Sequence, residues 1–308
     1  MTTFVLRRLL WIVPSLFAVF TLTFLVVHAT PGSPWDESEK PLPEAVKRNL
    51  NLQYHLDDPL YKQYADYLAN AVRGDFGPSY RSVERSVSEI IGATLPVSVQ
   101  LGLASMLFAL TVGIPLGALA AVRHNTWIDY LASLVTMSGI ATPPFVRVSL
   151  LIVLFSLALG WLPTGGWNGI WDARAIIPII AIGSGPAAIF ARYTRSSLLE
   201  VLGQDFIRTA RAKGLRGGTI IRRHAMKNAL IPISTVAGVT LANVITGAFF
   251  VERIYGVPGI GRQFIDSVTG RDYPLLLGIV LVFALLILVV NFLVDLSYGV
   301  LDPRISLR

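Results

Sequence analysis

The sequence contains no cysteine, so disulfide bonds and thiolate-bound metals are excluded. It is also poor in charge, since only 15% of its 308 residues are Asp, Glu, Lys or Arg, whereas about 25% is usual in a soluble domain. Neither a Gly-Lys dipeptide nor a His-Glu-x-x-His motif occurs, which excludes a Walker A phosphate loop and a zincin-type metal site. We therefore expect no enzyme, no cofactor, and no catalytic or metal-binding residue.

Apolar residues are abundant, at 53% of the chain, and the mean hydropathy is +0.61. They form long blocks separated by charged segments, and a helix needs about 20 apolar residues to cross a bilayer. The first block follows Arg7-Arg8 and exceeds the roughly 7–15 residues of a secretory signal core, so we expect an uncleaved helix. The sequence predicts an all-α integral membrane protein with six transmembrane helices, at Leu9–Val27, Pro96–Val122, Tyr130–Leu159, Ala175–Phe190, Ala229–Phe250 and Pro274–Ser297.

Two of these blocks carry residues that disturb a helix. The third contains Thr142-Pro143-Pro144, and two prolines remove two backbone donors, so this helix should break or kink. The fourth is short and carries Gly183-Ser184-Gly185-Pro186 in its middle. Irregular backbone at membrane depth is tolerated only against protein or a wet cavity. Both segments are therefore expected inside the bundle.

The distribution of charge predicts the orientation. Six spans place both termini on one side, and that side carries most of the Lys and Arg, concentrated between Arg192 and Lys227. Basic residues in short loops mark the cytoplasmic face, so both termini are expected in the cytoplasm. The net charge of +7 then reflects membrane orientation and not nucleic-acid binding. The predicted parts are residues 1–29 (cytoplasmic tip and first helix), 30–95 (extracytoplasmic loop), 96–298 (membrane core, with a cytoplasmic loop at 192–228) and 299–308 (cytoplasmic tail).

The extracytoplasmic loop has one helical pattern. Tyr61, Tyr64, Tyr67 and Leu68 recur at the spacing of a helix face. This stripe favours a small amphipathic cap packed on the bundle, and a ligand site is the alternative.

The cytoplasmic loop contains a short predicted helix. Asp205 is a suitable N-cap, and Gly214 is suited to the position after the helix, where a positive φ is common. The two turns between them carry the small residues Ala210 and Ala212, whose smooth face could enter a groove of another protein. An ordinary basic loop held at the anionic inner leaflet is the alternative.

Polar residues inside the spans allow two interpretations. Arg147 follows the proline break, and a charge at that depth faces a cavity or a partner. It either lines a path through the bundle, where it could bind a carboxylate, or pairs structurally with an acid of another subunit, which we favour. Asn243 lies in the fifth predicted span, and Asn291 and Asp295 share one face of the last span. For these three we favour helix–helix hydrogen bonding over pathway lining.

Several motifs in order along the chain carry a family resemblance. The cytoplasmic stretch 209–215, Thr-Ala-Arg-Ala-Lys-Gly-Leu, continues through Arg223-His224-Ala225 and Asn228-Ala229-Leu230-Ile231-Pro232. It resembles the coupling loop of binding-protein-dependent importer permeases, and in particular the dipeptide/oligopeptide/nickel permease family of ABC transporters. The Glu-Ala-Ala start preferred in the wider superfamily is absent. Further similar motifs are Gly74-Asp75-Phe76-Gly77, Gly113-Ile114-Pro115-Leu116-Gly117, Pro258-Gly259-Ile260-Gly261, Arg271-Asp272-Tyr273-Pro274 and Leu301-Asp302-Pro303-Arg304.

The resemblance implies the type I importer permease fold and a set of partners. They are a second homologous permease, two cytoplasmic ATPases, an extracytoplasmic substrate-binding protein and the bilayer, with di- or oligopeptides, nickel chelates or glutathione-like peptides as cargo. It implies an outer gate at Glu252, Tyr255, Pro258 and Gly259, for which a simple turn with solvated charges is the alternative. The residues implied to couple to an ATPase are Asp205, Phe206, Thr209, Ala210, Arg211, Ala212, Lys213, Gly214 and Leu215.

Two rival functions stay open at this point. An ion-coupled secondary transporter would need repeat symmetry and carboxylates near the midplane, whereas Asp295 is the only acid within a predicted span and sits towards one end. A membrane scaffold without transport activity would leave the coupling-like loop unexplained.

Overall fold

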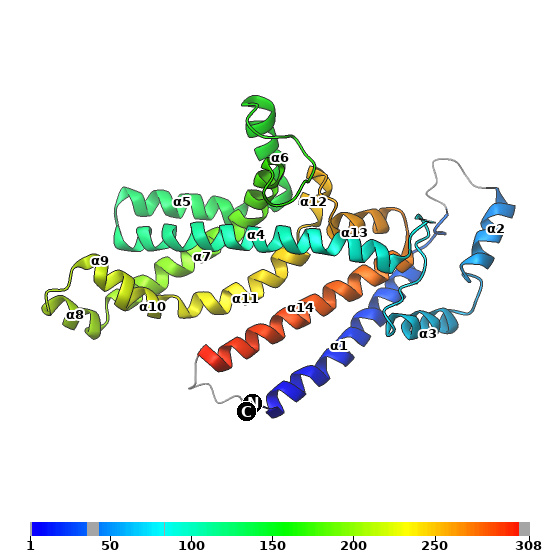
Figure 1. Ribbon diagram of the computed structural model, residues 1–308, viewed down its shortest axis with the longest axis horizontal. Helices are drawn as coiled ribbons and strands as arrows, with labels where there is room; N and C mark the ends of the chain where they lie inside the picture. The colour runs from blue at the N-terminus through cyan, green and yellow to red at the C-terminus, as the bar shows by residue number, and fades with distance from the viewer. Residues whose placement is uncertain (1, 36–42, 83, 302–308) are drawn as a thin grey trace. The chain divides into compact units, whose positions relative to one another are not determined.

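The computed structural model describes residues 2–35, 43–82 and 84–301, and helices joined by irregular segments make up the chain in these ranges (Figure 1). Apart from one isolated bridge between Pro78 and Ser86, no strand pairing occurs in them. The predicted tail at 299–308 lies mostly outside the described residues, as does most of the Leu301-Asp302-Pro303-Arg304 motif. The predicted all-α membrane fold is confirmed.

Four unbroken helices of the described chain are long and apolar enough to cross a membrane. They are α1 (Thr2–Ala29), α4 (Val87–Val122), α7 (Ile176–Leu202) and α14 (Tyr273–Leu301). Two further pairs pass the same criterion but are bent, by 110° between α5 and α6 and by 53° between the α9–α10 segment and α11. Six spans therefore result only if each bent pair is counted as one.

The break predicted in the third block occurs at the proline pair. Helix α5 (Trp127–Ala141) ends before Thr142, and Pro143 then caps α6 (Pro144–Leu151), which continues as the π-helical turn η1 (Ile152–Ala158). A residue before proline is forced out of the helical region, and Thr142 has an extended ψ of 123°. Because the bend is 110°, the block predicted at Tyr130–Leu159 is one span only if this bent pair is counted as one.

The second span begins earlier than predicted, at Val87 instead of Pro96. The reason is a capping box, in which Ser86 N–H donates to Glu89 Oε2 (2.9 Å) and Glu89 N–H donates to Ser86 Oγ (3.2 Å). Hydropathy missed this start because the first turns of α4 are not uniformly apolar. The loop predicted over 30–95 thus ends at residue 86.

The fourth span was predicted to be short and irregular, and this was wrong. Helix α7 runs without interruption from Ile176 to Leu202 and passes through Pro186. Apolarity ends near Phe190, but the helix continues through a polar segment. Its glycines serve close packing, since a β-carbon on Gly183 would lie 2.6 Å from the backbone oxygen of Ser105 on α4. More than half of the most apolar 18-residue stretch of this helix is buried, which agrees with the predicted place inside the bundle.

The described chain divides into two compact units. The first contains Met1–Ser98 and Pro258–Val289, and the second contains Val99–Val257 and Val290–Ser306. In the first unit, α1 and the beginnings of α4 and α14 are joined by three shorter helices, α2 (Glu44–Gln53), α3 (Leu60–Ala71) and α13 (Ile260–Thr269).

The second unit is built around α7, which packs along α5, α6 and α11. The remaining elements of this unit are η2 (Ala173–Ala175), α8 (Asp205–Ala212), α9 (Gly217–Thr219), η3 (Ile220–Ala225), α10 (Met226–Ala229), α11 (Ile231–Thr246) and α12 (Phe249–Tyr255).

The amphipathic cap predicted in the first loop is present as α3. Its Tyr64, Tyr67 and Leu68 pack against a core of Phe20 and Phe24 from α1 with Leu277 from α14. Both tyrosine hydroxyls are hydrogen bonded, Tyr64 to Thr21 Oγ1 (2.7 Å) and Tyr67 to the Pro274 carbonyl (3.0 Å). Tyr61 does not belong to the packed face, because it is 77% exposed.

The Arg271-Asp272-Tyr273-Pro274 motif holds the first unit together. The carboxylate of Asp272 is buried, accepts from the backbone N–H of Tyr80 (3.2 Å) and from Ser79 Oγ, and caps α14 through Leu275 N–H (3.3 Å). One side chain thus ties the segment before α4 to the start of α14. The motif has a structural role in this unit.

Candidate functional site: the surface of α8

Helix α8 has the extent that the sequence predicted, from Asp205 to Ala212. Its N-cap is Gln204, and Asp205 is the first helical residue. Asp205 Oδ1 lies 3.3 Å from Arg208 Nη1. The C-terminal end is confirmed in detail. Gly214 has φ +73°, Leu215 N–H donates to Ala210 O (3.3 Å), and Gly214 N–H donates to Arg211 O (2.9 Å). These two bonds form a Schellman motif, which requires a left-handed residue and therefore favours glycine.

The inner face of α8 is seated on its own bundle. Ile207 is fully buried and Ala210 is 6% exposed. Both belong to one apolar cluster with Ala121 of α4, Leu198 of α7 and the η3–α10 residues Ile220, Ala225 and Ala229. Ala210, which we had placed on the docking face, is therefore part of the seat. Burial of apolar area on one side holds the helix in place.

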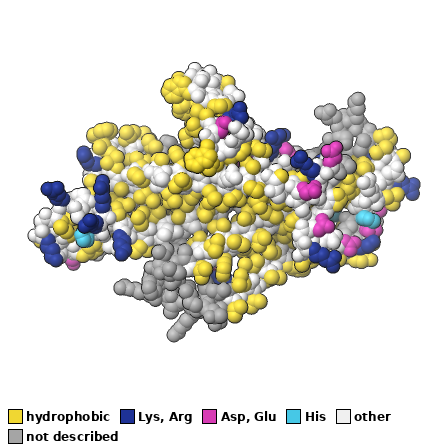
Figure 2. Space-filling model, in the orientation of Figure 1, with side chains coloured by type: hydrophobic (Ala, Val, Ile, Leu, Met, Phe, Trp, Pro, Cys, Tyr) yellow, Lys and Arg dark blue, Asp and Glu magenta, His cyan; other side chains and the backbone are white. Residues whose placement is uncertain are grey.

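The outer face of α8 is free in the described chain. Phe206 is 43% exposed and Leu215 is 39% exposed, so two large apolar side chains stand in solvent beside basic ones. Figure 2 shows Lys and Arg gathered over α8, α9 and α10. The other exposed members of the predicted coupling set are Asp205, Thr209, Arg211, Ala212, Lys213 and Gly214. Exposed aromatic and apolar side chains together with Arg are common at protein-binding surfaces.

Arg147 makes structural contacts within its own unit. Its Nη1 donates to Ser184 Oγ on α7 (2.8 Å) and to the Gly139 carbonyl at the end of α5 (3.2 Å). A β-carbon on Gly185 would lie 2.9 Å from Nη2, so glycine makes room for the guanidinium. Arg147 thus ties α5, α6 and α7 together across the proline break, and it forms no ion pair with a described residue. Pathway lining and pairing with an acid of another subunit both stay predictions for Arg147, because the described contacts all lie within its own chain.

The predicted gate residues differ in burial. Glu252 is fully buried, so the alternative of a turn with solvated charges is wrong for this residue. Tyr255 is 1% exposed; its hydroxyl donates to Pro163 O (2.9 Å) and its carbonyl accepts from Gly166 N–H (2.7 Å). Burial raises the pKa of the Tyr255 phenol. In the first unit, Pro258 is exposed and Gly259 is the N-cap of α13.

Comparison with known proteins decides the family. The family model described as "Binding-protein-dependent transport system inner membrane component" matches residues 113–307. The chain belongs to this family. The dipeptide transport system permease protein DppB of Bacillus subtilis is 41% identical over 308 residues, which is 100% of this chain and 99% of that protein. The oligopeptide permease OppB of Haemophilus influenzae is 40% identical, and the glutathione permease GsiC of Escherichia coli is 39% identical, each over at least 99% of both chains.

The fold agrees with this assignment. The inward-facing MetNI methionine ABC transporter matches 69% of this chain and 96% of that chain with a TM-score of 0.60, at 18% identity. The chain is therefore a multi-pass permease subunit of an ABC importer with the type I fold. It is not itself an enzyme, because the ATPase of such a system is a separate subunit. The secondary transporter and the scaffold find no support in these relatives.

Three further polar residues of the permease keep both of their interpretations. Asn243 on α11 is exposed, and Asn291 and Asp295 on α14 are partly buried. Helices α11 and α14 approach closely nearby, since a β-carbon on Gly238 would lie 2.2 Å from Val294 Cγ2. Pathway lining and helix packing both stay predictions for these three residues. No group of three or more His, Asp or Glu side chains in the described chain could hold a metal.

One cluster in the permease was missed by sequence reasoning. Asp129, in the first turn of α5, is 2% exposed and is bound by Arg195 of α7 through two bonds, Nε–Oδ1 (2.6 Å) and Nη2–Oδ2 (2.8 Å). The backbone N–H of Asn125, a residue with φ +60°, donates to the same carboxylate (3.0 Å), and His124 Nδ1 lies 3.1 Å from it. We had used the basic residues between Arg192 and Lys227 only as a signal of orientation. Only Asn125 offered a local signal, since Asn tolerates positive φ in turns.

Proposed function

We propose that the permease forms half of a peptide pathway, paired with a second homologous permease, and that the outer face of α8 receives one of two cytoplasmic ATPases. The observation that carries this proposal is the exposure of Phe206 on α8 and of Leu215 just after it, while the opposite face of α8 is seated on its own bundle. A docked motor can move the bundle only through an element that is both accessible and anchored. ATP must also favour one membrane state, so the α8 contact must differ between the two states.

The proposed orientation follows from charge. Exposed Lys and Arg gather at α8–α10 (Figure 2), and basic loops mark the cytoplasmic face. Both termini would then be cytoplasmic, in the inner membrane of a bacterium. The segments around Glu252, Tyr255, Pro258 and Gly259 would face the substrate-binding protein on the other side and contribute to the outer gate.

Peptides are the cargo that we propose, because the relatives that match the whole chain are named for dipeptide, oligopeptide and glutathione transport. Uptake of a labelled dipeptide, a labelled pentapeptide, glutathione and a nickel chelate into proteoliposomes of the complete complex would separate these classes. Uptake of none of the three peptides would contradict the peptide assignment.

The absence of cysteine provides a direct test of docking. A Thr209→Cys variant carries a unique thiol on the exposed face of α8. A thiol-to-amine cross-linker should join it to the ATPase, with a yield that changes when ATP is bound. Trp171→Cys, at a position that is 95% exposed and far from α8 in the sequence, is the control and should not cross-link. Cross-linking of neither variant, or of both equally, would contradict docking at α8.

A further inference from the structure

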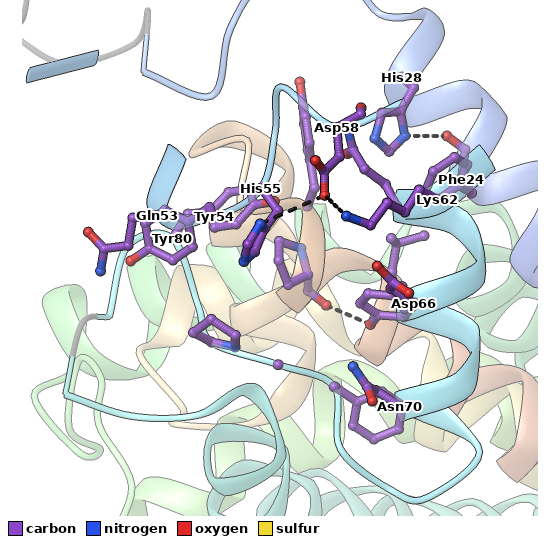
Figure 3. A pocket seen from close by; sticks show the side chains of 18 residues that line it. Phe24, His28, Gln53, Tyr54, His55, Asp58, Lys62, Asp66, Asn70 and Tyr80 are labelled. Carbon is purple, nitrogen blue, oxygen red and sulfur yellow. Dashed lines mark hydrogen bonds and ion pairs between the residues drawn. The ribbon is translucent and has the colours of Figure 1, made fainter. Parts of the chain in front are cut away.

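A half-open pocket of about 270 Å³ lies at the surface of the first unit and has no role in the function proposed above (Figure 3). It is lined by α3, by the end of α1 and the start of α14, and by the segments around Tyr54 and Tyr80, and its lining residues Lys62, Asp66 and Asn70 are exposed. Its volume suits a molecule the size of an amino acid. Its two walls differ in chemistry, one aromatic and the other polar.

The aromatic wall is a row of rings in contact. Tyr54 and Tyr80 lie 4.9 Å apart between ring centroids, Tyr80 and Tyr273 6.2 Å, Tyr273 and His28 5.7 Å, and His28 and Phe24 4.0 Å. The faces of such rings carry partial negative charge and attract cations. His28 adds an acceptor. Its Nδ1 lies 2.8 Å from the Phe24 carbonyl, which can only accept, so Nδ1 carries hydrogen and Nε2 of the neutral ring can accept another bond.

The polar wall follows one face of α3. Asp58, Lys62, Asp66 and Asn70 recur every four residues, from the residue before the cap of α3 to its last turn, and all four line the pocket. Asp58 and Lys62 form an ion pair of 2.9 Å, and His55 lies 3.7 Å from the same carboxylate. The Lys62 hydrogen bond lowers the pKa of Asp58, and the Asp58 hydrogen bond raises the pKa of Lys62. These two charges therefore cancel over a wide pH range.

Asp66 supplies the remaining charge of this wall. It forms no hydrogen bond and no ion pair within 4 Å with a described residue, and Lys62 acts on it only through a longer-range charge interaction. In Figure 3 its carboxylate stands beside the Lys62 chain on the α3 side of the pocket. The pocket thus offers a carboxylate, an imidazole acceptor and a row of aromatic faces. All three favour a positively charged ligand.

We propose that this pocket binds a small organic ammonium compound from the aqueous phase, with its ammonium group between Asp66 and the aromatic wall. The apolar part of the ligand would lie against Phe24 and Leu277, which also line the pocket. The cap is therefore a binding site in addition to a packing element. The inference goes beyond the proposed function and does not depend on it, because it concerns only residues of the first unit.

The experiment uses the full chain in phosphatidylglycerol nanodiscs and calorimetric titration with L-leucinamide, which is cationic and carries no carboxylate. N-acetyl-L-leucinamide, of the same shape but without the charge, should not bind. Asp66→Asn should weaken leucinamide binding about fivefold, as expected for the loss of one partly exposed ion pair. Asp57→Asn is the matched control, since Asp57 is an exposed acid of the same segment that does not line the pocket, and it should leave binding unchanged.

For a third variant we expect leucinamide affinity to increase. Lys62→Met removes the cation and releases Asp58, so leucinamide should bind more tightly. Weaker binding by this variant, unchanged binding by Asp66→Asn, or equal binding of the acetylated analogue would overturn the proposal. Phosphatidylethanolamine also carries an ammonium group. Its addition to the nanodiscs therefore tests whether the site takes a lipid headgroup or a ligand from the aqueous phase. Competition with leucinamide would assign the site to a lipid headgroup and overturn the aqueous ligand.

Discussion

Two short amphipathic helices outside the long spans, α3 and α8, are held in different ways. The inner face of α3 carries large aromatic side chains, and two of its tyrosine hydroxyls are hydrogen bonded to α1 and to the start of α14. The inner face of α8 carries only Ile207 and Ala210, which make apolar contacts. A glycine lies on either side of the helix, Gly203 at the end of α7 and Gly214 after the end of α8. Specific hydrogen bonds fix α3 in one position, whereas an apolar seat holds α8 without fixing its orientation so strictly.

The difference suits the proposed roles. A helix that bounds a ligand pocket must keep its side chains in place, and α3 does so through directional bonds. A helix that transmits motion must keep contact with its bundle while its angle changes, and small apolar contacts allow such sliding. The following predictions test this contrast, beginning with the largest expected effect.

The first prediction concerns α7, from which α8 continues. Asp129→Asn leaves the Arg195 guanidinium without its buried anion, and we expect the free energy of unfolding to fall by about 3–4 kcal/mol. The measurement is unfolding in mixed detergent, followed by circular dichroism. Glu200→Gln on the exposed side of the same helix is the control and should change little. Equal stability of the two variants would show that the Asp129–Arg195 pair is dispensable.

The second prediction separates the two faces of α8. Ile207→Ala removes the largest side chain of the seat and should cost about 2–3 kcal/mol locally, which hydrogen exchange would detect as faster exchange of the α8 amides. Phe206→Ala should leave exchange unchanged but weaken binding of the ATPase. If Phe206→Ala loosened α8 instead, the division into seat and docking face would be wrong.

The third prediction concerns the end of α8. Gly214→Val places a β-branched residue at φ +73°, which costs about 1–3 kcal/mol of strain. We expect peptide uptake per ATP hydrolysed to fall about tenfold while the bundle remains folded. Gly217→Val is a matched control, because Gly217 has no positive φ and open space around its Cα. Undiminished uptake by Gly214→Val in proteoliposomes would contradict the coupling role.

The fourth prediction tests whether hydrogen bonds position α3. Tyr67→Phe keeps the ring but removes the bond to the Pro274 carbonyl, and it should cost about 1 kcal/mol. Hydrogen exchange of α3 reports the change. A similar exchange rate in the variant and the parent protein would mean that packing alone positions this helix.

The smallest effect is a pH dependence of the cap. The pKa of Asp58 is lowered by Lys62, so its contribution to stability is present above the ordinary pKa of Asp and is lost as the pH falls through the lowered value. The pKa of Lys62 is raised, so its contribution is lost only as the pH rises through that higher value. Protection of the α3 amides should therefore be flat near neutrality and decline in acid, and Asp58→Asn should remove the contribution of this pair to the acid decline.

Local features of the fold were predictable. The break at Pro143 and the left-handed turn at Gly214 follow from the backbone limits of single residues. The start of α4 also depends on local residues, because Ser86 and Glu89, three residues apart, form a capping box. Hydropathy alone does not detect this helix start. The length of α7 was missed for the same reason, since its last turns are helical without being apolar.

Features of the site that depend on distant pairs were not predictable. Arg147 could be recognised as a residue that needs a partner, but its bond to Ser184, 37 residues away, required the packing of α6 on α7. For Glu252 the sequence left an outer gate and a solvated turn open, and only the packed structure shows that this side chain is buried.

The sequence by itself determined the class of the protein, the helix break at Pro143 and the two-turn helix α8, because hydropathy, proline, glycine and capping act within a few residues. Tertiary structure decided which faces are covered. Asp129 meets Arg195 across 66 residues, and Tyr67 meets Pro274 across 207. Such contacts arise from the packing of whole helices, in which many alternatives have similar local energies, so no short stretch of sequence specifies them.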